Sequence, residues 1–322
     1  MDNILITSAG QRVSLVKFFQ NEIRKLNSQN KVFTVDLNPV LSPACQISDG
    51  FEKVEKVSDP AYIDHLLDFC KKNDIKLVVP TIDTELLVLA ENQKKFLTNG
   101  IKVVISSADF INMCRDKRKT GDFFAGCGID VPMVMNKNNL SFPLFIKPYD
   151  GSLSKDTFLV LKESELNEYH FENEKLIFME YIDHDLHDEY TVDAYYDQNS
   201  VLKCLVPRKR IFVRAGEVNK GVTSKNEILT FVKKKLSKIA GAIGCITLQF
   251  FFNPQTRRII GIEINPRFGG GYPLSYLAGA NYPKFLIDEY ILQKRISYFE
   301  DWEDHLLMLR YEDEVLVRNY EK

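Results

Sequence analysis

The sequence predicts an α/β fold, in which a doubly wound unit of parallel strands and helices is followed by an α+β part. Two observations predict it. Short apolar strands alternate with helical segments up to about residue 108, and strand-like runs joined by turns predominate after that point. With 322 residues and 45% hydrophobic content, the chain can bury a large core and is expected to form two or three domains.

Composition and charge narrow the classes of function. The formal net charge is −2, which gives no electrostatic argument for a nucleic acid or an anionic membrane as partner. No stretch reaches the ~18 apolar residues needed to span a bilayer, and the N-terminus lacks the basic region of a signal peptide. We therefore expect a cytoplasmic protein that binds neither nucleic acid nor membrane. The six cysteines are scattered without a C-x-x-C pair, which favours reduced thiols.

The first unit alternates strands with helices. One strand is expected to begin at Asn3, and further strands are expected at 32–36, 77–80 and 102–105. Helices are expected at 14–26, 61–72 and 85–96. This alternation predicts a Rossmann-like domain over residues 1–108, in which ligands bind at the carboxyl ends of the parallel strands. The loop after the first strand has one glycine instead of the pattern G-x-G-x-x-G. That difference argues against an NAD dehydrogenase, because close approach to a pyrophosphate needs the missing glycines.

A lysine in an apolar strand marks the next region. Lys147 is the only charged residue of the strand 142–148, and an unpaired buried ammonium is very costly, so this lysine needs an anion. The following loop contains Gly151, Ser152 and Ser154, which can offer backbone and hydroxyl donors to phosphates although the chain has no Walker A sequence. The other elements expected here are a helix over 109–124, a break at 126–132 and a strand at 157–160.

A basic stretch follows three expected strands, at 176–183, 188–196 and 201–206. Arg208, Lys209, Arg210 and Arg214 place four cations within seven residues. No aromatic stacking platform accompanies them, so nucleic-acid binding is disfavoured. Neutralising a triphosphate and a carboxylate is the more economical use. Arg208 and Arg214 are the residues predicted to do so, because arginine binds such anions bidentately.

The segment 248–267 reads as two apolar strands joined by a polar turn at Asn253-Pro254. Glu263 and Asn265 are two residues apart, so both project from one face of their strand. In an antiparallel hairpin, Gln249 lies roughly level with Glu263 to Arg267. Oxygen donors beside a guanidinium are what Mg²⁺ and a polyphosphate require together. The alternative is a half-exposed hairpin whose polar residues are solvated.

The remaining elements surround this hairpin. The apolar spacing in the helix 226–242 indicates core packing. The glycines of 269–271, with Gly270 at the centre, permit close backbone approach to an acyl phosphate or an acceptor, and a plain turn is the alternative. Helices at 274–278 and 284–293 and a strand at 306–310 are expected to complete the fold.

A glutamine followed on the next strand by Glu-x-Asn-Pro-Arg resembles the metal-binding signature of the ATP-grasp superfamily, in its carbamoyl-phosphate-synthase-like branch. The sequence from Asp116 to Pro132 is similar to the entry into the first lobe of that fold. The resemblance covers nearly the whole chain. It implies a Rossmann-like pre-ATP-grasp domain at 1–108, a first ATP-grasp lobe with the phosphate lid at 109–180, and a second lobe with the metal site at 181–322.

The resemblance also implies roles for individual residues. Lys117 and Lys147 would hold ATP phosphates under the lid of Gly151, Ser152 and Ser154. Backbone groups around Glu180, Tyr181 and Ile182 would recognise adenine, and Glu189 would bind ribose. Gln249, Glu263 and Asn265 would hold two Mg²⁺ ions, for which Mn²⁺ could substitute, and Arg267 would meet the phosphorylated intermediate. Ser8, Gly10, Arg12, Asp83 and Glu85 would face the acceptor substrate, unless Ser8 and Gly10 only shape a turn while Asp83 and Glu85 cap a helix.

The implied activity is that of an ATP-dependent ligase. A small-molecule carboxylate would be phosphorylated, and an amine would then attack the acyl phosphate with release of ADP and phosphate. One alternative is activation of bicarbonate, as in carbamoyl-phosphate synthase, although the chain has one grasp unit and no sign of a glutaminase. Another is a non-catalytic nucleotide or metabolite binder on the same fold. The family often forms dimers, so a homodimer is among the expected assemblies.

Overall fold

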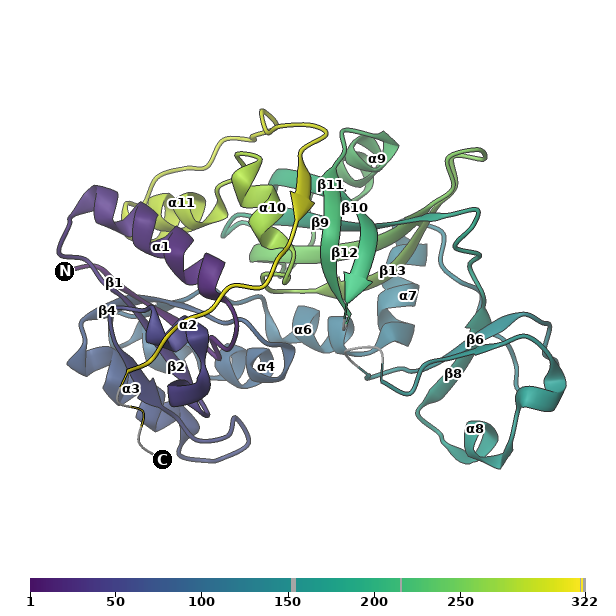
Figure 1. The fold of residues 1–322 in the computed structure, drawn as a ribbon, viewed down its shortest axis with the longest axis horizontal. Coiled ribbons are helices and arrows are strands. Elements are labelled where there is room, and N and C mark those ends of the chain that lie inside the picture. Colours follow the sequence, from purple (N-terminus) through teal and green to yellow (C-terminus); the bar gives the residue numbers. More distant parts are fainter. Residues whose placement is uncertain (152–154, 215, 319, 321–322) are drawn as a thin grey trace.

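The computed structural model describes residues 1–151, 155–214, 216–318 and 320, so the predicted lid residues Ser152 and Ser154 lie outside the described part. Three sheets organise the chain (Figure 1). One sheet falls within each of the ranges 1–108, 109–180 and 181–322. The predicted α/β unit and the α+β part that follows it are confirmed, and the domain limits themselves stay a prediction.

The N-terminal unit is a five-stranded parallel sheet with the order β3-β2-β1-β4-β5. Its central strands β1, β2 and β4 are mainly apolar and buried because helices cover both faces. Its elements are β1 (Asn3–Thr7), α1 (Val13–Leu26), β2 (Val32–Asp36), η1 (Pro39–Leu41), α2 (Pro43–Gln46), β3 (Phe51–Lys53), α3 (Tyr62–Lys72), β4 (Ile75–Val79), α4 (Asp83–Glu91), α5 (Gln93–Leu97) and β5 (Lys102–Val103).

Two helices and a small lobe come next. The lobe is a three-stranded antiparallel sheet with the order β7-β6-β8, and it lies at the end of the molecule opposite the N-terminal unit (Figure 1). The helix α7 instead packs on the large sheet, where the ring of Phe124 meets Phe250. The elements are α6 (Ala108–Arg115), α7 (Lys117–Gly126), β6 (Leu144–Pro148), β7 (Phe158–Val160), η2 (Glu163–Glu165), α8 (Glu168–Glu172) and β8 (Leu176–Glu180).

The third sheet has six strands in the order β13-β12-β9-β10-β11-β14, and every neighbouring pair is antiparallel. Figure 1 places it between the other two units. Its strands are β9 (Asp188–Tyr196), β10 (Leu202–Arg214), β11 (Glu217–Thr223), β12 (Gly244–Phe252), β13 (Ile259–Asn265) and β14 (Leu307–Leu309). Its helices are α9 (Glu227–Lys235), α10 (Tyr272–Leu277), α11 (Tyr282–Leu286) and the π-helical turn η3 (Ile287–Ile291).

A continuous core joins the N-terminal unit to the large sheet. Buried side chains of α1, β9, β12 and α11 belong to one apolar cluster. At the junction the ring of Phe18 stacks on Tyr276 with centroids 3.7 Å apart, and the Tyr276 hydroxyl donates to Glu22. The two units therefore present a fixed relative geometry to any site between them. Among the described residues, no helix combines the length and the apolar character that crossing a membrane requires.

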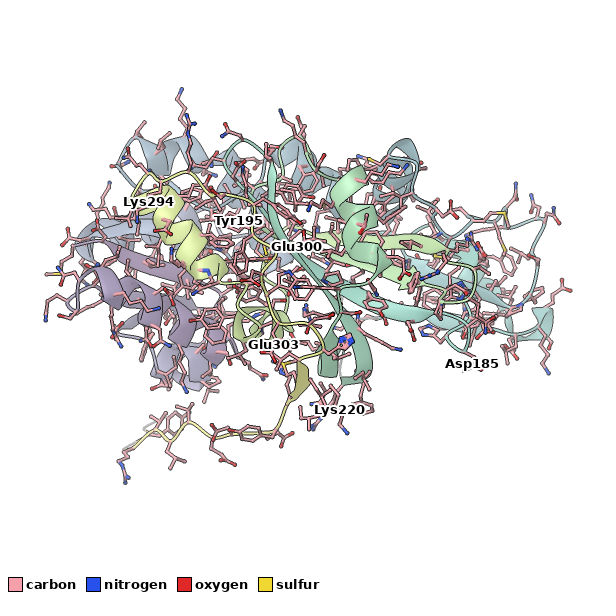
Figure 2. The ribbon with its side chains drawn as sticks, turned by 90° about the horizontal axis from the view of Figure 1, so that it is seen from above. Asp185, Tyr195, Lys220, Lys294, Glu300 and Glu303 are labelled. Carbon is pink, nitrogen blue, oxygen red and sulfur yellow. The ribbon has the colours of Figure 1, made fainter. Side chains whose placement is uncertain are left out.

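The structure corrects some expected boundaries. The helix expected over 226–242 ends at Lys235, because the chain that follows turns back to residues 200–202 at the start of β10. The backbone N–H of Leu202 donates to Ser237, and that of Ile239 donates to Ser200. The strand expected to end at residue 206 continues to Arg214, where it pairs with a strand that the sequence did not predict, β11. Seen from above, the chain after β14 runs away from the main body (Figure 2).

The loop after β3 is tied to α3 by a histidine. His65 contacts Glu52 at 2.9 Å and Glu55 at 2.8 Å, and these hydrogen bonds raise the pKa of His65 above its usual value. Stability from this contact is therefore fully present below about pH 6.5 and is lost as pH rises through the folded-state pKa. Replacing His65 with glutamine is expected to lower the free energy of unfolding by about 1 kcal/mol or less at pH 5.5, and by less at pH 8.5. Urea unfolding of both proteins at both pH values measures this, and an equal loss at the two pH values would contradict it.

Candidate active site

A cleft of about 870 Å³ lies where the three units meet. Residues of all three line it, which brings together most of the side chains singled out from the sequence. Those in the lining are Arg12, Asp83, Lys117, Lys147, Gly151, Glu180, Tyr181, Ile182, Glu189, Arg208, Gln249, Glu263, Asn265, Arg267 and Gly270.

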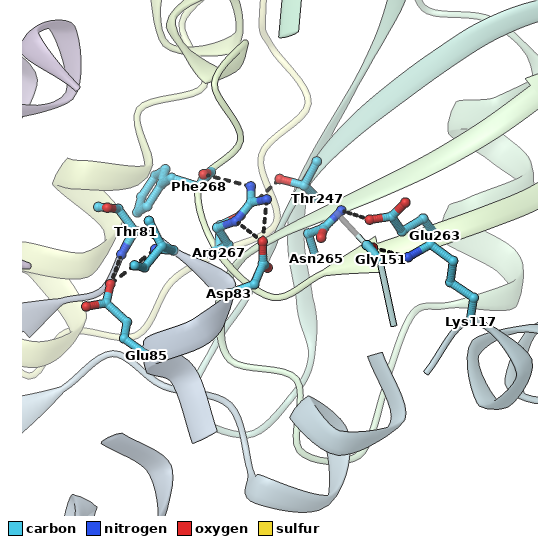
Figure 3. Close-up of polar contacts among 11 residues, drawn as sticks. Thr81, Asp83, Glu85, Lys117, Gly151, Thr247, Glu263, Asn265, Arg267 and Phe268 are labelled. Carbon is cyan, nitrogen blue, oxygen red and sulfur yellow. Dashed lines mark hydrogen bonds and ion pairs between the residues drawn. The ribbon is translucent and has the colours of Figure 1, made fainter. Parts of the chain in front are cut away.

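The β12–β13 hairpin supplies one wall of the cleft. Its register sets Gln249 directly opposite Glu263 and Thr247 opposite Asn265, as expected for an antiparallel hairpin. The Asn265 amide donates to Glu263 Oε1 at 3.0 Å, which leaves the Asn265 carbonyl oxygen as an acceptor (Figure 3). The hairpin is held in place from behind, because Gly261 lets the ring of Phe124 approach so closely that an added Cβ would lie 2.6 Å from it.

These donors fit Mg²⁺ only in part. Glu263 gives one carboxylate, and Gln249 and Asn265 give amide oxygens, which are hard ligands. The parts of the chain that the structure describes contain no group of three His, Cys, Asp or Glu side chains arranged for a metal ion. Mg²⁺ commonly binds through one or two carboxylates together with substrate phosphates. The residues therefore fit a metal that arrives with a nucleotide.

This donor set predicts that metal binding depends on nucleotide. Titrating the protein with Mn²⁺ as a probe is expected to give binding at least about tenfold weaker without ADP or ATP than with it, because phosphate oxygens complete the coordination. Electron paramagnetic resonance of free Mn²⁺ measures both affinities. Equal affinity in the two titrations would show that the protein alone forms a complete metal site.

Two lysines face the hairpin across the cleft. Lys147 on β6 is 9% exposed, and no carboxylate of the described residues lies within ion-pair distance of it. Burial lowers the pKa of Lys147 to about 8, and the charges of Glu263 and Glu189 oppose this effect only in part. Lys117, at the start of α7, donates to the carbonyl of Gly151 at 2.5 Å (Figure 3). The structure thus places Lys147 in the cleft without a carboxylate partner among the described residues, as expected for a lysine that binds an anionic ligand.

The chain leaves the small lobe along one edge of the cleft. β8 ends at Glu180, whose backbone N–H donates to Met133, and Tyr181 and Ile182 continue along the cleft. Within the described ranges, the backbone N–H of Ile182 has no hydrogen-bond partner. Glu189 lies beside this segment and pairs with Arg210 at 2.7 Å. A free backbone donor next to apolar side chains and a carboxylate is suited to a purine nucleoside.

Arg267 links the hairpin to the N-terminal unit. Its guanidinium donates to Asp83 Oδ2 at 2.7 Å and 3.0 Å, and its backbone carbonyl accepts from Thr247 (Figure 3). Asp83 lies in the first turn of α4, at the carboxyl end of β4. The contact holds Arg267 over the cleft but also partly neutralises it.

Three of the residues predicted to face the acceptor substrate are not in the cleft lining. The Glu85 carboxylate is buried and accepts from the backbone of Thr81 and Ile82 and from the hydroxyl of Ser8. The backbone N–H of Gly10 donates to Asp36. These contacts agree with the alternative that the sequence left open, in which Ser8 and Gly10 shape a turn and Glu85 caps a helix. The three residues thereby shape the loops that present Arg12 and Asp83.

The positions of the arginines of β10 differ from those that the sequence predicted. Arg208 is 1% exposed and forms a bidentate pair with Asp193, yet its Nη1 has no hydrogen-bond partner within the described part. Arg214 lies outside the cleft lining and pairs with Glu312. The pairing with β11 shifts register on both sides of Phe212, so the alternation that would place Arg208 and Arg214 on one face is broken. Arg210 occupies the cleft instead, donating to Glu189 and Gln249.

The sequence also gave no sign of a side pocket of about 90 Å³ next to the cleft. Arg12, Glu217 and Gly270 border both spaces, and Arg310 closes the side pocket. Arg310 donates to Glu217 Oε2 at 3.1 Å across 93 residues of sequence. No local pattern marks such a contact, because it depends on how β14 pairs with β11.

Two family models match the chain in agreement with this geometry. A model described as the PylC-like N-terminal domain matches residues 4–104, and one described as ATP-grasp in the biosynthetic pathway with Ter operon matches residues 172–312. Residues 172–312 therefore belong to an ATP-grasp family. The predicted ATP-grasp fold and the order of a Rossmann-like domain before it are confirmed by these matches.

Solved structures repeat the same ATP-grasp fold. Biotin carboxylase from Campylobacter jejuni has a TM-score of 0.71 at 15% identity, covering 95% of this chain and 74% of that chain. N5-carboxyaminoimidazole synthetase from Staphylococcus aureus, complexed with ADP, has a TM-score of 0.69 at 16% identity, covering 89% and 76%. L-amino acid ligase from Bacillus licheniformis has a TM-score of 0.66 at 16% identity, covering 90% and 74%. A comparison with curated proteins found no match.

Proposed function

We propose that this ATP-grasp enzyme activates a small-molecule carboxylate as an acyl phosphate, which an amine then attacks to form an amide. The observation that carries the proposal is the cleft itself. A carboxylate and two amide oxygens on one wall face a buried ammonium that has no carboxylate partner among the described residues, and an arginine stands at the end next to the N-terminal unit. Opposed oxygen donors and cations of this kind suit a triphosphate with its metal.

Each wall has a distinct task in this proposal. The free backbone donor of Ile182 and the carboxylate of Glu189 receive the nucleoside, and Lys147 and Lys117 receive its phosphates. Glu263, Asn265 and Gln249 would hold Mg²⁺, which would neutralise charge on the transferring phosphoryl group. Arg267 meets the acyl phosphate, and Arg210 takes the place in the cleft that was predicted for Arg214. Catalysis then rests on positioning and charge neutralisation, with no protein nucleophile required.

The activity is tested by ADP release. The protein is incubated with Mg²⁺ and ATP and with single amino acids or other carboxylates, each alone and together with amines. Release that depends on one acid and one amine is expected. ATP binding without turnover across the panel would instead support a non-catalytic nucleotide-binding protein, and failure to bind ATP would overturn the proposal.

The solved structures named above support the chemistry without fixing the substrate. One is an L-amino acid ligase and another a biotin carboxylase, and both share less than 20% identity with this chain. Two Mg²⁺ ions, substitution by Mn²⁺ and a homodimer stay predictions. The side pocket described above helps to distinguish among the candidate substrates.

A further inference from the structure

The side pocket carries an inference that rests on the proposed function and names the class of the amine. The pocket opens into the cleft between Arg12 and Glu217, close to Arg267. Its volume of about 90 Å³ equals that of about three water molecules in the liquid. It therefore admits a small polar head group and leaves the rest of a ligand in the cleft.

A free guanidinium stands on one side of the pocket. Arg12 is half-buried, and its side chain makes no hydrogen bond or ion pair with any described residue, whereas Arg208, Arg210, Arg267 and Arg310 all have carboxylate partners. Burial, and then the nearby charge of Arg267, lower the pKa of Arg12. A half-buried, unpaired guanidinium is a site for an anion, which would be bound bidentately.

The N-terminal end of α1 favours an anion on the same side of the pocket. The helix starts at Val13 with no side-chain cap and no acidic residue in its first turn, and Ser14 and Leu15 line the pocket. Uncapped N–H groups at the start of a helix favour a negative charge. Arg12 and the helix therefore act on the same anionic group.

A carboxylate stands on the other side. Glu217 uses Oε2 for Arg310, while Oε1 has no hydrogen-bond partner in the described ranges. This oxygen lies directly over Gly270, where an added Cβ would be 2.2 Å away, so the glycine is what lets the carboxylate reach the mouth of the pocket. The carboxylate thus lies between the pocket and the part of the cleft beside Arg267.

We propose that the acceptor is a zwitterion of the α-amino acid type, whose carboxylate binds Arg12 and the start of α1 and whose ammonium binds Glu217. A plain amine would leave Arg12 without an anion, and a plain acid would be repelled by Glu217. The two sites are separated by a pocket that holds only the head group, so the side chain of the acceptor extends into the cleft.

The same arrangement gives Glu217 a part in the reaction. The ammonium gives one proton to the Glu217 carboxylate, and the neutral nitrogen attacks the carbonyl carbon of the acyl phosphate. The bond between that carbon and the phosphate oxygen breaks, the phosphate leaves with the electron pair, and it takes up the second proton that the nitrogen releases. Amide, phosphate and a protonated Glu217 are formed, and Glu217 returns its proton to water.

The test separates acyl-phosphate formation from use of the acceptor. Native protein, Arg12→Met and Glu217→Gln are given Mg-ATP, the carboxylate panel and one of three nucleophiles: a standard amino acid, the amine obtained by its decarboxylation, or hydroxylamine. Hydroxylamine traps an acyl phosphate as a hydroxamate and has neither charge of the zwitterion. Glu312→Gln is the control variant, because Glu312 is exposed and pairs outside the cleft.

The native protein is expected to use an amino acid at least about tenfold better in kcat/KM than the matching amine, because one charge-assisted contact is worth about that factor. Arg12→Met is expected to raise the KM of the amino acid and to erase this preference. Glu217→Gln is expected to lower kcat with the amino acid more than with hydroxylamine and to make the remaining rate rise with pH as the free amine forms. Glu312→Gln is expected to behave as the native protein.

Two results would overturn the inference alone: hydroxamate formation with no preference for amino acids over amines, or equal losses with amino acid and hydroxylamine in both variants. Absence of hydroxamate with every carboxylate would overturn the proposed function, and this inference with it.

Discussion

Replacing Lys147 with methionine is expected to stabilise the unliganded protein and to abolish most of its affinity for ATP. Burial without a carboxylate partner lowers the pKa of Lys147 to about 8, against an ordinary value of 10.5. At pH 7 the buried charge therefore costs the folded state up to about 3 kcal/mol, which an apolar side chain of similar length would remove. ATP binding is expected to weaken by at least about a hundredfold, because the phosphates lose a desolvated cation.

The pH dependence of this effect has a definite sign. A lysine whose folded-state pKa is lowered destabilises the fold most at pH values below about 8, and the penalty disappears as pH rises from there to about 10.5. The gain in the free energy of unfolding from Lys147→Met is therefore expected to be large at pH 7 and small at pH 10. Urea unfolding of both proteins without ATP measures it. A variant that is less stable than the native protein at pH 7 would show that the ammonium is satisfied.

Replacing Glu263 with glutamine is expected to lower kcat by about a hundredfold or more with little change in stability. Glu263 supplies the only carboxylate of the oxygen donors on the β12–β13 hairpin, and its amide analogue keeps the shape of the side chain but not the charge. The loss should appear in kcat more than in the KM for ATP, because the charge acts most strongly on the transferring phosphoryl group.

Two controls make this result interpretable. Glu312→Gln removes a carboxylate from an exposed ion pair outside the cleft and is expected to leave kcat unchanged. Thermal unfolding of Glu263→Gln is expected to match that of the native protein, since Glu263 has one internal hydrogen bond, from Asn265. A Glu263→Gln protein with more than half of the native kcat would remove the hairpin from the catalytic account.

The sequence predicted the fold where short-range patterns decide the structure. β1 is a run of buried, mainly apolar residues, and β13 is rich in buried isoleucine. The turn at Asn253-Pro254 sets the register that places Gln249 opposite Glu263. The sequence failed where long-range pairing decides. β11 is a strand of mixed polarity that lies between β10 and β14, and it forms because it pairs with both of them. β14, by contrast, lies within the strand expected at 306–310.

The same distinction holds for the cleft. Lys147 was predictable because a single charge in an apolar strand needs a partner. Arg214 was misplaced because the irregular pairing around Phe212 reverses the alternation of β10. The bridge from Arg267 to Asp83 spans 184 residues, and no local pattern in either segment announces it. The side pocket depends most on such contacts, which is why Glu217 and Arg310 were found only in the structure.

Transfer of ¹⁸O from the carboxylate to phosphate tests the central claim most directly. The acid that supports ADP release is labelled with ¹⁸O in its carboxyl group, and the phosphate formed during one turnover is analysed by mass spectrometry. Activation as an acyl phosphate predicts one ¹⁸O atom in each phosphate released. Unlabelled phosphate, or ¹⁸O found in AMP, would contradict the account, because the carboxylate oxygen would then not have attacked the γ-phosphate.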